Sequence, residues 1–128
     1  MKHTLTIIAL LLCLVAHASE PTREYHNIND SWRFYYANDL DNDNAHHITL
    51  PHTWNTNDSG YEAEYERTTA NYLRTTWIPK EWQDRRIFLR FGGVQSVANV
   101  FINGKHVGEH RGGYTAFTME ITDMVRYG

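Results

Sequence analysis

Apolar residues in the second half of the chain recur at every second position, and this alternation limits the possible fold more than any other feature. Residues 71–78, 87–91 and 114–121 each show the pattern, and no part of the chain after residue 18 sustains an apolar repeat at helical spacing. If one face of each strand is buried, the last two segments bury Ile87, Leu89, Phe91, Phe117, Met119 and Ile121. The sequence therefore predicts an all-β fold.

A tight turn is expected at Asn103-Gly104, between two further apolar segments at residues 97–102 and 105–108. Asn-Gly is the pair best suited to the two consecutive positive φ angles of a type I′ turn, so the two segments should form a hairpin. The expected register pairs Val100 with Val107 and Phe101 with His106. At least five strands joined by short turns predict a β-sandwich.

Two polar stretches, residues 38–47 and 55–71, precede most of these strands and are predicted to be loops. They flank a compact block at residues 48–54, in which Trp54 could pack into the core after the bend at Pro51. The second stretch is long for a connection without secondary structure. Long ordered loops on a rigid sheet are often binding sites, so this stretch is the first candidate for function.

Residues 1–18 have the organisation of a secretory signal peptide. Lys2 precedes an apolar run at residues 5–15, which is too short to span a membrane, and Ala16 and Ala18 are the small residues that signal peptidase requires. We therefore expect residues 19–128 to be one exported domain, located in the periplasm or outside the cell. The single cysteine of the chain lies inside the leader, so the mature domain would form no disulfide and would depend on its core.

The charge balance argues against a nucleic-acid partner. The chain has 12 Lys and Arg residues, of which Lys2 lies in the leader, against 15 Asp and Glu residues, and the basic residues form no cluster. All four Trp and all eight Tyr residues follow the leader, a content that suits carbohydrate contact as well as core packing. The composition therefore leaves carbohydrate open as a partner and gives no reason to expect nucleic acid or a membrane span.

No metal, cofactor or hydrolase motif is expected. Residues 39–44 imitate the beginning of a calcium-binding loop, but Asn44 and Leu50 stand where that loop requires Gly and Glu. A zinc site would need a third ligand at a suitable spacing, which is missing for His46, His47, His106 and His110. The chain also lacks the Gly-x-Ser-x-Gly sequence of a nucleophile elbow.

A series of short motifs runs from about Trp32 to the end of the chain. In order, they are Leu50-Pro51-His52-Thr53-Trp54-Asn55, Tyr72-Leu73-Arg74, Trp77-Ile78-Pro79, residues 88–96, residues 100–108 and Gly112-Gly113-Tyr114-Thr115-Ala116-Phe117. Together they resemble the N-terminal sugar-binding domain of glycoside hydrolase family 2, which includes β-galactosidases, β-glucuronidases and β-mannosidases. The resemblance implies a jelly-roll β-sandwich of the galactose-binding-domain type, followed in complete members by an immunoglobulin-like domain and a TIM barrel.

The resemblance also bears on catalysis and on the candidate site. Retaining glycosidases use two carboxyl groups, and in this family both are glutamates of the barrel, whose motifs are absent here. Whether the chain is an enzyme therefore stays open, but alone it is not expected to hydrolyse glycosides. The first domain of the family contributes a loop that narrows the sugar pocket at the mouth of the barrel. Residues 55–71 are the candidate for this loop, with Asp58, Glu64, Tyr65 and Arg67 as sugar-contacting side chains.

Residues 120–128 resemble a turn of the family after which further strands normally complete the sandwich. We therefore expect the jelly roll to be incomplete at its C-terminal end and to be the leading part of a longer, secreted glycosidase. Two alternatives stay open from the sequence. One is an independent carbohydrate-binding module or lectin, and the other is a jelly-roll interaction domain without a sugar site.

Overall fold

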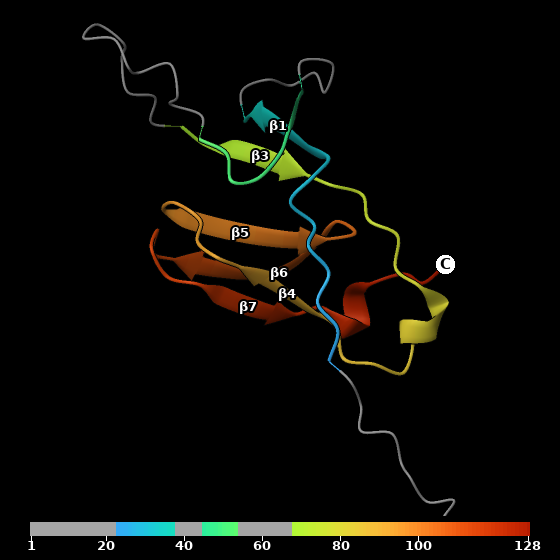
Figure 1. Ribbon diagram of the computed structural model, residues 1–128. Coiled ribbons are helices and arrows are strands. Elements are labelled where there is room, and N and C mark those ends of the chain that lie inside the picture. Colours follow the sequence, from blue (N-terminus) through green and yellow to red (C-terminus); the bar gives the residue numbers. More distant parts are fainter. Residues whose placement is uncertain (1–22, 38–44, 54–67) are drawn as a thin grey trace, which may run out of the picture. The chain divides into compact units, whose positions relative to one another are not determined.

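The computed structural model describes residues 23–37, 45–53 and 68–128, which carry the coloured ribbon in Figure 1. Their regular structure consists of seven strands and two short 3₁₀ helices, η2 (Lys80–Trp82) and η3 (Thr122–Met124). The predicted all-β class is therefore confirmed for the described part of the chain. The chain divides into two compact units, residues 1–72 and residues 73–128.

The first unit is built on a three-stranded sheet in the order β2-β1-β3. Its strands are β1 (Trp32–Tyr36), β2 (His46–Ile48) and β3 (Ala70–Leu73), which ends at the boundary between the units. Strands β1 and β2 are antiparallel, with Trp32 opposite Ile48. The sequence pattern did not predict β1, because its aromatic residues lie on both faces and hide the alternation, although aromatic residues favour strands.

The prediction that residues 38–47 and 55–71 are loops was wrong at their ends. His46 and His47 belong to β2, and Ala70 and Asn71 belong to β3. These strands are only three and four residues long, too short to display an alternating pattern in the sequence. Most of both stretches, and the proposed core residue Trp54, lie outside the described residues.

The second unit contains two antiparallel strand pairs. The first pair joins β4 (Phe88–Phe91) to β7 (Phe117–Glu120), and the second joins β5 (Val97–Ile102) to β6 (Lys105–Arg111). The predicted inward-facing residues of the first pair are the less exposed ones, so that prediction is confirmed. Val100 and Ile121, with 8% and 7% of their surfaces exposed, are the most deeply buried apolar residues described in this unit.

The hairpin between β5 and β6 has the predicted turn. Asn103 and Gly104 have φ angles of 49° and 78°, as a type I′ turn requires, and Asn103 Nδ2 donates a hydrogen bond to the carbonyl oxygen of Met124 at 2.8 Å. The predicted pairing of Phe101 with His106 is confirmed.

The predicted pairing of Val100 with Val107 was wrong, because Val100 lies opposite Gly108. A register shift next to Val100 inserts one extra residue into β6, which is a β-bulge. With this shift, neither valine side chain is exposed: Val100 is buried and Val107 is half-buried. The turn sequence therefore predicts the pairing of residues in the two strands only up to the first bulge.

Two predicted strands are shorter than their patterns. The segment at residues 71–78 forms a strand only up to Leu73, and the segment at residues 114–121 forms one only from Phe117 to Glu120. Alternation predicts an extended chain, but a strand also needs a neighbour to accept its backbone hydrogen bonds. Beyond Leu73, Arg74 Nε instead donates to Thr76 Oγ1 at 2.9 Å, and Trp77 is 67% exposed.

Candidate functional site

The four side chains predicted to contact sugar, Asp58, Glu64, Tyr65 and Arg67, lie outside the described residues. Their assignment stays a prediction. The structure does describe the chain on both sides of the segment that holds them, up to Thr53 and again from Thr68. These flanks show how the two ends of residues 54–67 are held.

Four rings gather beside these flanks and form what we call the ring cluster: Phe34, Tyr36, His52 and Tyr72. Phe34 lies at its centre, with only 4% of its surface exposed and its ring centroid 4.8 Å from His52 and 5.1 Å from both Tyr36 and Tyr72. The period of two along β1 places Phe34 and Tyr36 on the same face, and the neighbouring strand β3 supplies Tyr72. Three rings of the cluster therefore come from the sheet, and the fourth, His52, comes from the segment that follows β2.

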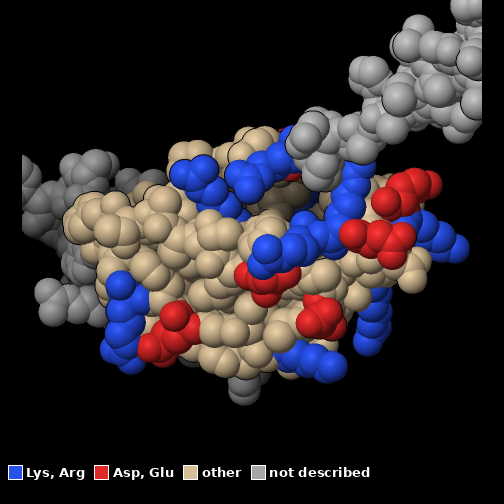
Figure 2. All heavy atoms as spheres, turned by 90° about the horizontal axis from the view of Figure 1, so that it is seen from below, with Lys and Arg blue, Asp and Glu red and all other residues tan. Residues whose placement is uncertain are grey.

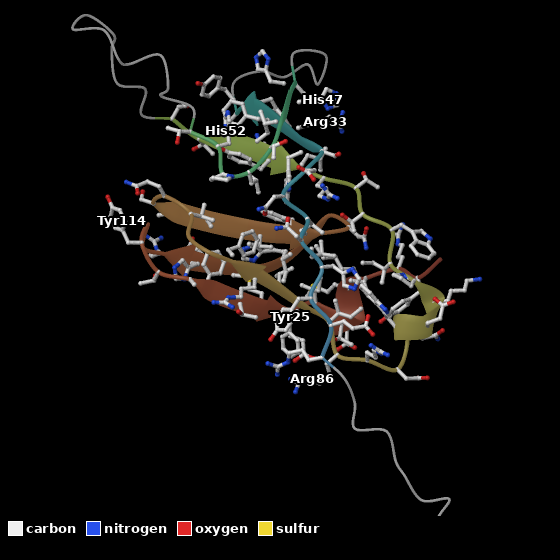
Figure 3. All side chains as sticks on the ribbon, in the orientation of Figure 1. Tyr25, Arg33, His47, His52, Arg86 and Tyr114 are labelled. Carbon is white, nitrogen blue, oxygen red and sulfur yellow. The ribbon has the colours of Figure 1, made fainter. Side chains whose placement is uncertain are left out.

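One hydrogen bond joins the two flanks of residues 54–67, and a second joins the C-terminal flank to the end of β1. His52 Nδ1 and the hydroxyl oxygen of Tyr72 are 3.0 Å apart, although the two residues are 20 positions apart in the sequence. The backbone N–H of Ala37, directly after β1, donates to the carbonyl oxygen of Thr69 at 2.9 Å. His52, labelled in Figure 3, and Tyr72 therefore bring the described residues on either side of this segment into contact.

The environment of the ring cluster favours the neutral forms of His52 and Tyr72. Burial lowers the pKa of His52, and the nearby charge of His46 lowers it further. Burial raises the pKa of the Tyr72 phenol, and Tyr36 adds to the shift. At neutral pH the pair consists of an imidazole and a phenol, which can hydrogen-bond uncharged groups such as sugar hydroxyls.

Two further histidines make polar side-chain contacts in the second unit. His106 Nε2 lies 3.1 Å from Asn99 Oδ1, and His110 Nε2 lies 3.2 Å from Thr115 Oγ1. Within the described ranges, no three His, Cys, Asp or Glu side chains come together in a way that could hold a metal ion. In the same residues, no helix has both the length and the hydropathy to cross a membrane.

Glu120 is the most strongly perturbed carboxyl group in the described residues, and it is held by an ion pair. Arg86 donates from Nε and Nη2 to the two carboxylate oxygens at 3.0 and 2.7 Å, and the Thr122 hydroxyl donates at 2.9 Å. The Arg86 hydrogen bonds, followed by that of Thr122, lower the pKa of Glu120 to about 2. A carboxyl group that stays ionised at neutral pH does not act as a general acid, and here the carboxylate is engaged by Arg86 and Thr122.

Surface charge on the described residues is mixed. Figure 2 shows acidic side chains lying among basic ones over the face seen from below. A second ion pair joins Arg111 Nε to Glu109 Oε1 at 2.6 Å. Sequence reasoning missed the Arg86 pair because 34 positions separate its members, and no motif in the sequence marks them as neighbours.

Comparison with known families identifies the class to which this fold belongs. The family described as "Glycosyl hydrolases family 2, sugar binding domain" matches residues 18–128, which is nearly the whole chain. The chain therefore belongs to glycoside hydrolase family 2 and corresponds to the N-terminal sugar-binding domain of its enzymes.

The relatives are much longer enzymes. A β-glucuronidase of Bacteroides fragilis is 44% identical over 123 residues, a match that covers 95% of this chain and 17% of the relative. A β-galactosidase of Thermoanaerobacter pseudethanolicus is 33% identical over 103 residues, covering 80% of this chain and 13% of the relative. The crystal structure of a Bacteroides uniformis β-glucuronidase matches with a TM-score of 0.73 and 39% identity, covering 83% of this chain and 13% of that one. The chain thus spans between 13% and 17% of the length of these relatives.

Proposed function

We propose that residues 19–128 act as the sugar-binding N-terminal domain of a β-glucuronidase-like glycosidase, and that other domains of the same enzyme cleave the glycosidic bond. The observation that carries the proposal is the 44% identity to a β-glucuronidase of which the match covers only 17%. By analogy with the family, the further domains would be an immunoglobulin-like domain and a TIM barrel that holds the catalytic glutamates. Carbohydrate is then the ligand of this domain.

For the architecture we propose a jelly-roll β-sandwich. The described strands are antiparallel where their registers are defined, and the TM-score of 0.73 to the Bacteroides uniformis enzyme supports a shared fold. Antiparallel sheets with one less exposed face and one polar face are the components from which such sandwiches are built.

Within this architecture, residues 55–71 would supply the loop that narrows the sugar pocket of the assembled enzyme. The ring cluster supports this role, because the His52 and Tyr72 contact holds its two flanks together. Asp58, Glu64, Tyr65 and Arg67 would then meet sugar hydroxyls from a loop whose ends lose little freedom on binding.

A glycan array probed with the whole chain tests the sugar-binding proposal. Binding to β-glucuronides or β-galactosides is expected, together with no hydrolysis of the corresponding nitrophenyl glycosides. Turnover by pure protein would show that the chain carries its own catalytic groups. Absence of binding to every glycan would favour an interaction domain without a sugar site.

We further propose that residues 1–18 are a cleaved leader and that the domain acts in the periplasm or outside the cell. The pattern of the leader supports this, and the family match begins at residue 18, where the leader would end. Mass spectrometry of the exported protein should find Ser19 as the first residue. A mature protein that retains residues 1–18 would contradict the proposal.

A further inference from the structure

Tyr114 is the most exposed large apolar or aromatic side chain in the described residues, with 93% of its surface accessible. It lies in the connection between β6 and β7, and Figure 3 shows it projecting outward from the second unit. A ring with this exposure contributes almost nothing to the core, so packing within its own unit does not explain it.

The loop that presents this ring is fixed by backbone contacts. Gly112 has a φ angle of 124°, which favours glycine, and its N–H donates to the carbonyl oxygen of Ser96 at 2.9 Å. A Cβ atom at Gly113 would collide with the side-chain carboxamide of Gln95, and one at Gly93 would lie 3.1 Å from the carbonyl oxygen of Gly113. The β4 to β5 and β6 to β7 connections therefore pack closely against each other at Gly93 and Gly113, with the Gln95 side chain filling the space beside Gly113.

A stack of three rings lies directly beside this loop. The Phe117 ring stacks on His110 with 4.0 Å between centroids and on Phe91 with 4.6 Å, at interplanar angles of 15° and 17°. His110 Nε2 also contacts the hydroxyl of Thr115 at 3.2 Å, so the residue after Tyr114 is tied to the stack. Both chain neighbours of Tyr114 are thus held in place, and a ligand that meets its ring need not order the loop first.

We propose that Tyr114 is a sugar-stacking residue, and that residues 92–96 and 111–115 form a platform that binds a pyranoside. This inference rests on the proposed function. A tyrosine ring offers a rigid apolar face with a polar hydroxyl at its tip, which suits a pyranose, because one face of that sugar presents C–H groups and its rim presents hydroxyls. The carboxamide of Gln95 lies against Gly113, the residue before Tyr114, and can supply a hydrogen-bond donor and an acceptor on the same platform.

The platform differs from the predicted loop at residues 55–71 in the unit to which it belongs and in the kind of contact expected with a ligand. It lies in the second unit and consists entirely of described residues, whereas the predicted loop belongs to the first. The aromatic face of Tyr114 would bind a sugar through apolar stacking contact, while the predicted loop would bind it through hydrogen-bonding side chains.

Saturation-transfer difference NMR and isothermal titration calorimetry with methyl β-D-glucopyranosiduronate and methyl β-D-galactopyranoside test the platform on the whole chain. We expect Tyr114→Ala to weaken binding about tenfold or more, as the loss of a central aromatic contact does, and Tyr114→Phe to bind nearly as the wild type. The matched control is Tyr25→Ala, which removes a tyrosine that is 78% exposed in the first unit and should leave binding unchanged.

The outcomes separate this inference from the proposed function. Wild-type binding that Tyr114→Ala leaves intact would overturn the platform and leave the sugar-binding function standing. Equal losses in Tyr114→Ala and Tyr25→Ala would also overturn it, because the effect would not be specific to the loop. If the wild type binds neither methyl glycoside nor any sugar on the array, both proposals fail together.

Discussion

Replacing Gly104 with Val tests whether the hairpin turn depends on backbone conformation. Gly104 has a φ angle of 78°, in the region that β-branched residues avoid. A Cβ atom built there meets no heavy atom within 4 Å, so the site has open space around the added side chain. Any loss of stability must therefore come from the strain of holding Val at a positive φ.

The expected loss follows from the cost of that conformation. A residue other than glycine held in the left-handed region costs about 1–3 kcal/mol, and Val belongs at the upper end of this range. Gly104→Asn should cost much less, because Asn tolerates the left-handed region. Gly92→Val is the matched control: its Cβ also meets nothing within 4 Å, and its φ is not positive, so we expect a change within about 0.5 kcal/mol.

Urea denaturation followed by circular dichroism gives the free energy of unfolding of each variant. The expected order of stability is wild type, then Gly104→Asn, then Gly104→Val, with Gly92→Val close to wild type. A Gly104→Val variant as stable as Gly92→Val would show that the turn can form without positive φ at this position. That result would refute the assignment of a type I′ turn.

Three further predictions concern the ring cluster and the Glu120 ion pair. Replacing Phe34 with Ala should lower the free energy of unfolding by about 3–5 kcal/mol in urea denaturation, and a loss below about 1 kcal/mol would contradict its central position. The pKa of His52 in the folded state lies below its ordinary value of 6.5, so the folded protein should keep its stability at neutral pH and lose some of it as the pH falls below 6.5. An NMR titration that places this pKa at or above 6.5 would contradict the argument that burial lowers it. The pKa of Glu120, about 2 against an ordinary 4.5, contributes stability above pH 4.5 that is lost as the pH falls toward 2. Replacing Arg86 with Ala should return this pKa toward 4.5, and an unchanged carboxyl titration would show that Arg86 does not hold it.

Sequence reasoning recovered the parts of the fold that local patterns determine. The period of two identified β4 and the inward face of β7, and Asn103-Gly104 identified the turn of the hairpin. It missed β1, whose aromatic residues occupy both faces, and it missed the bulge in β6, because an inserted residue leaves no mark in the turn sequence. An alternating pattern indicates that one segment is a strand, whereas the hydrogen-bonded pairing of that strand depends on the neighbouring segment.

The candidate functional residues likewise depend partly on local sequence motifs and partly on contacts between distant segments. The motif that contains Pro51 and His52 was part of the family resemblance, yet the contact between His52 and Tyr72 depends on β3 lying beside β1. Tyr114 was visible in the sequence only as part of a family motif that also suits core packing. Its exposure of 93% is a property of the folded loop, which two neighbouring glycines and Gln95 hold in place.

A domain exchange tests the central claim most directly. Residues 19–128 would replace the matching region of the Bacteroides fragilis β-glucuronidase, which is 44% identical to this chain, and the hybrid would be assayed with 4-nitrophenyl β-D-glucuronide. The control is the same enzyme with that region deleted. We predict hydrolysis well above that of the deletion variant, because the exchanged residues supply the domain that completes the enzyme. A folded hybrid no more active than the deletion variant would contradict the claim that these residues serve as its sugar-binding domain.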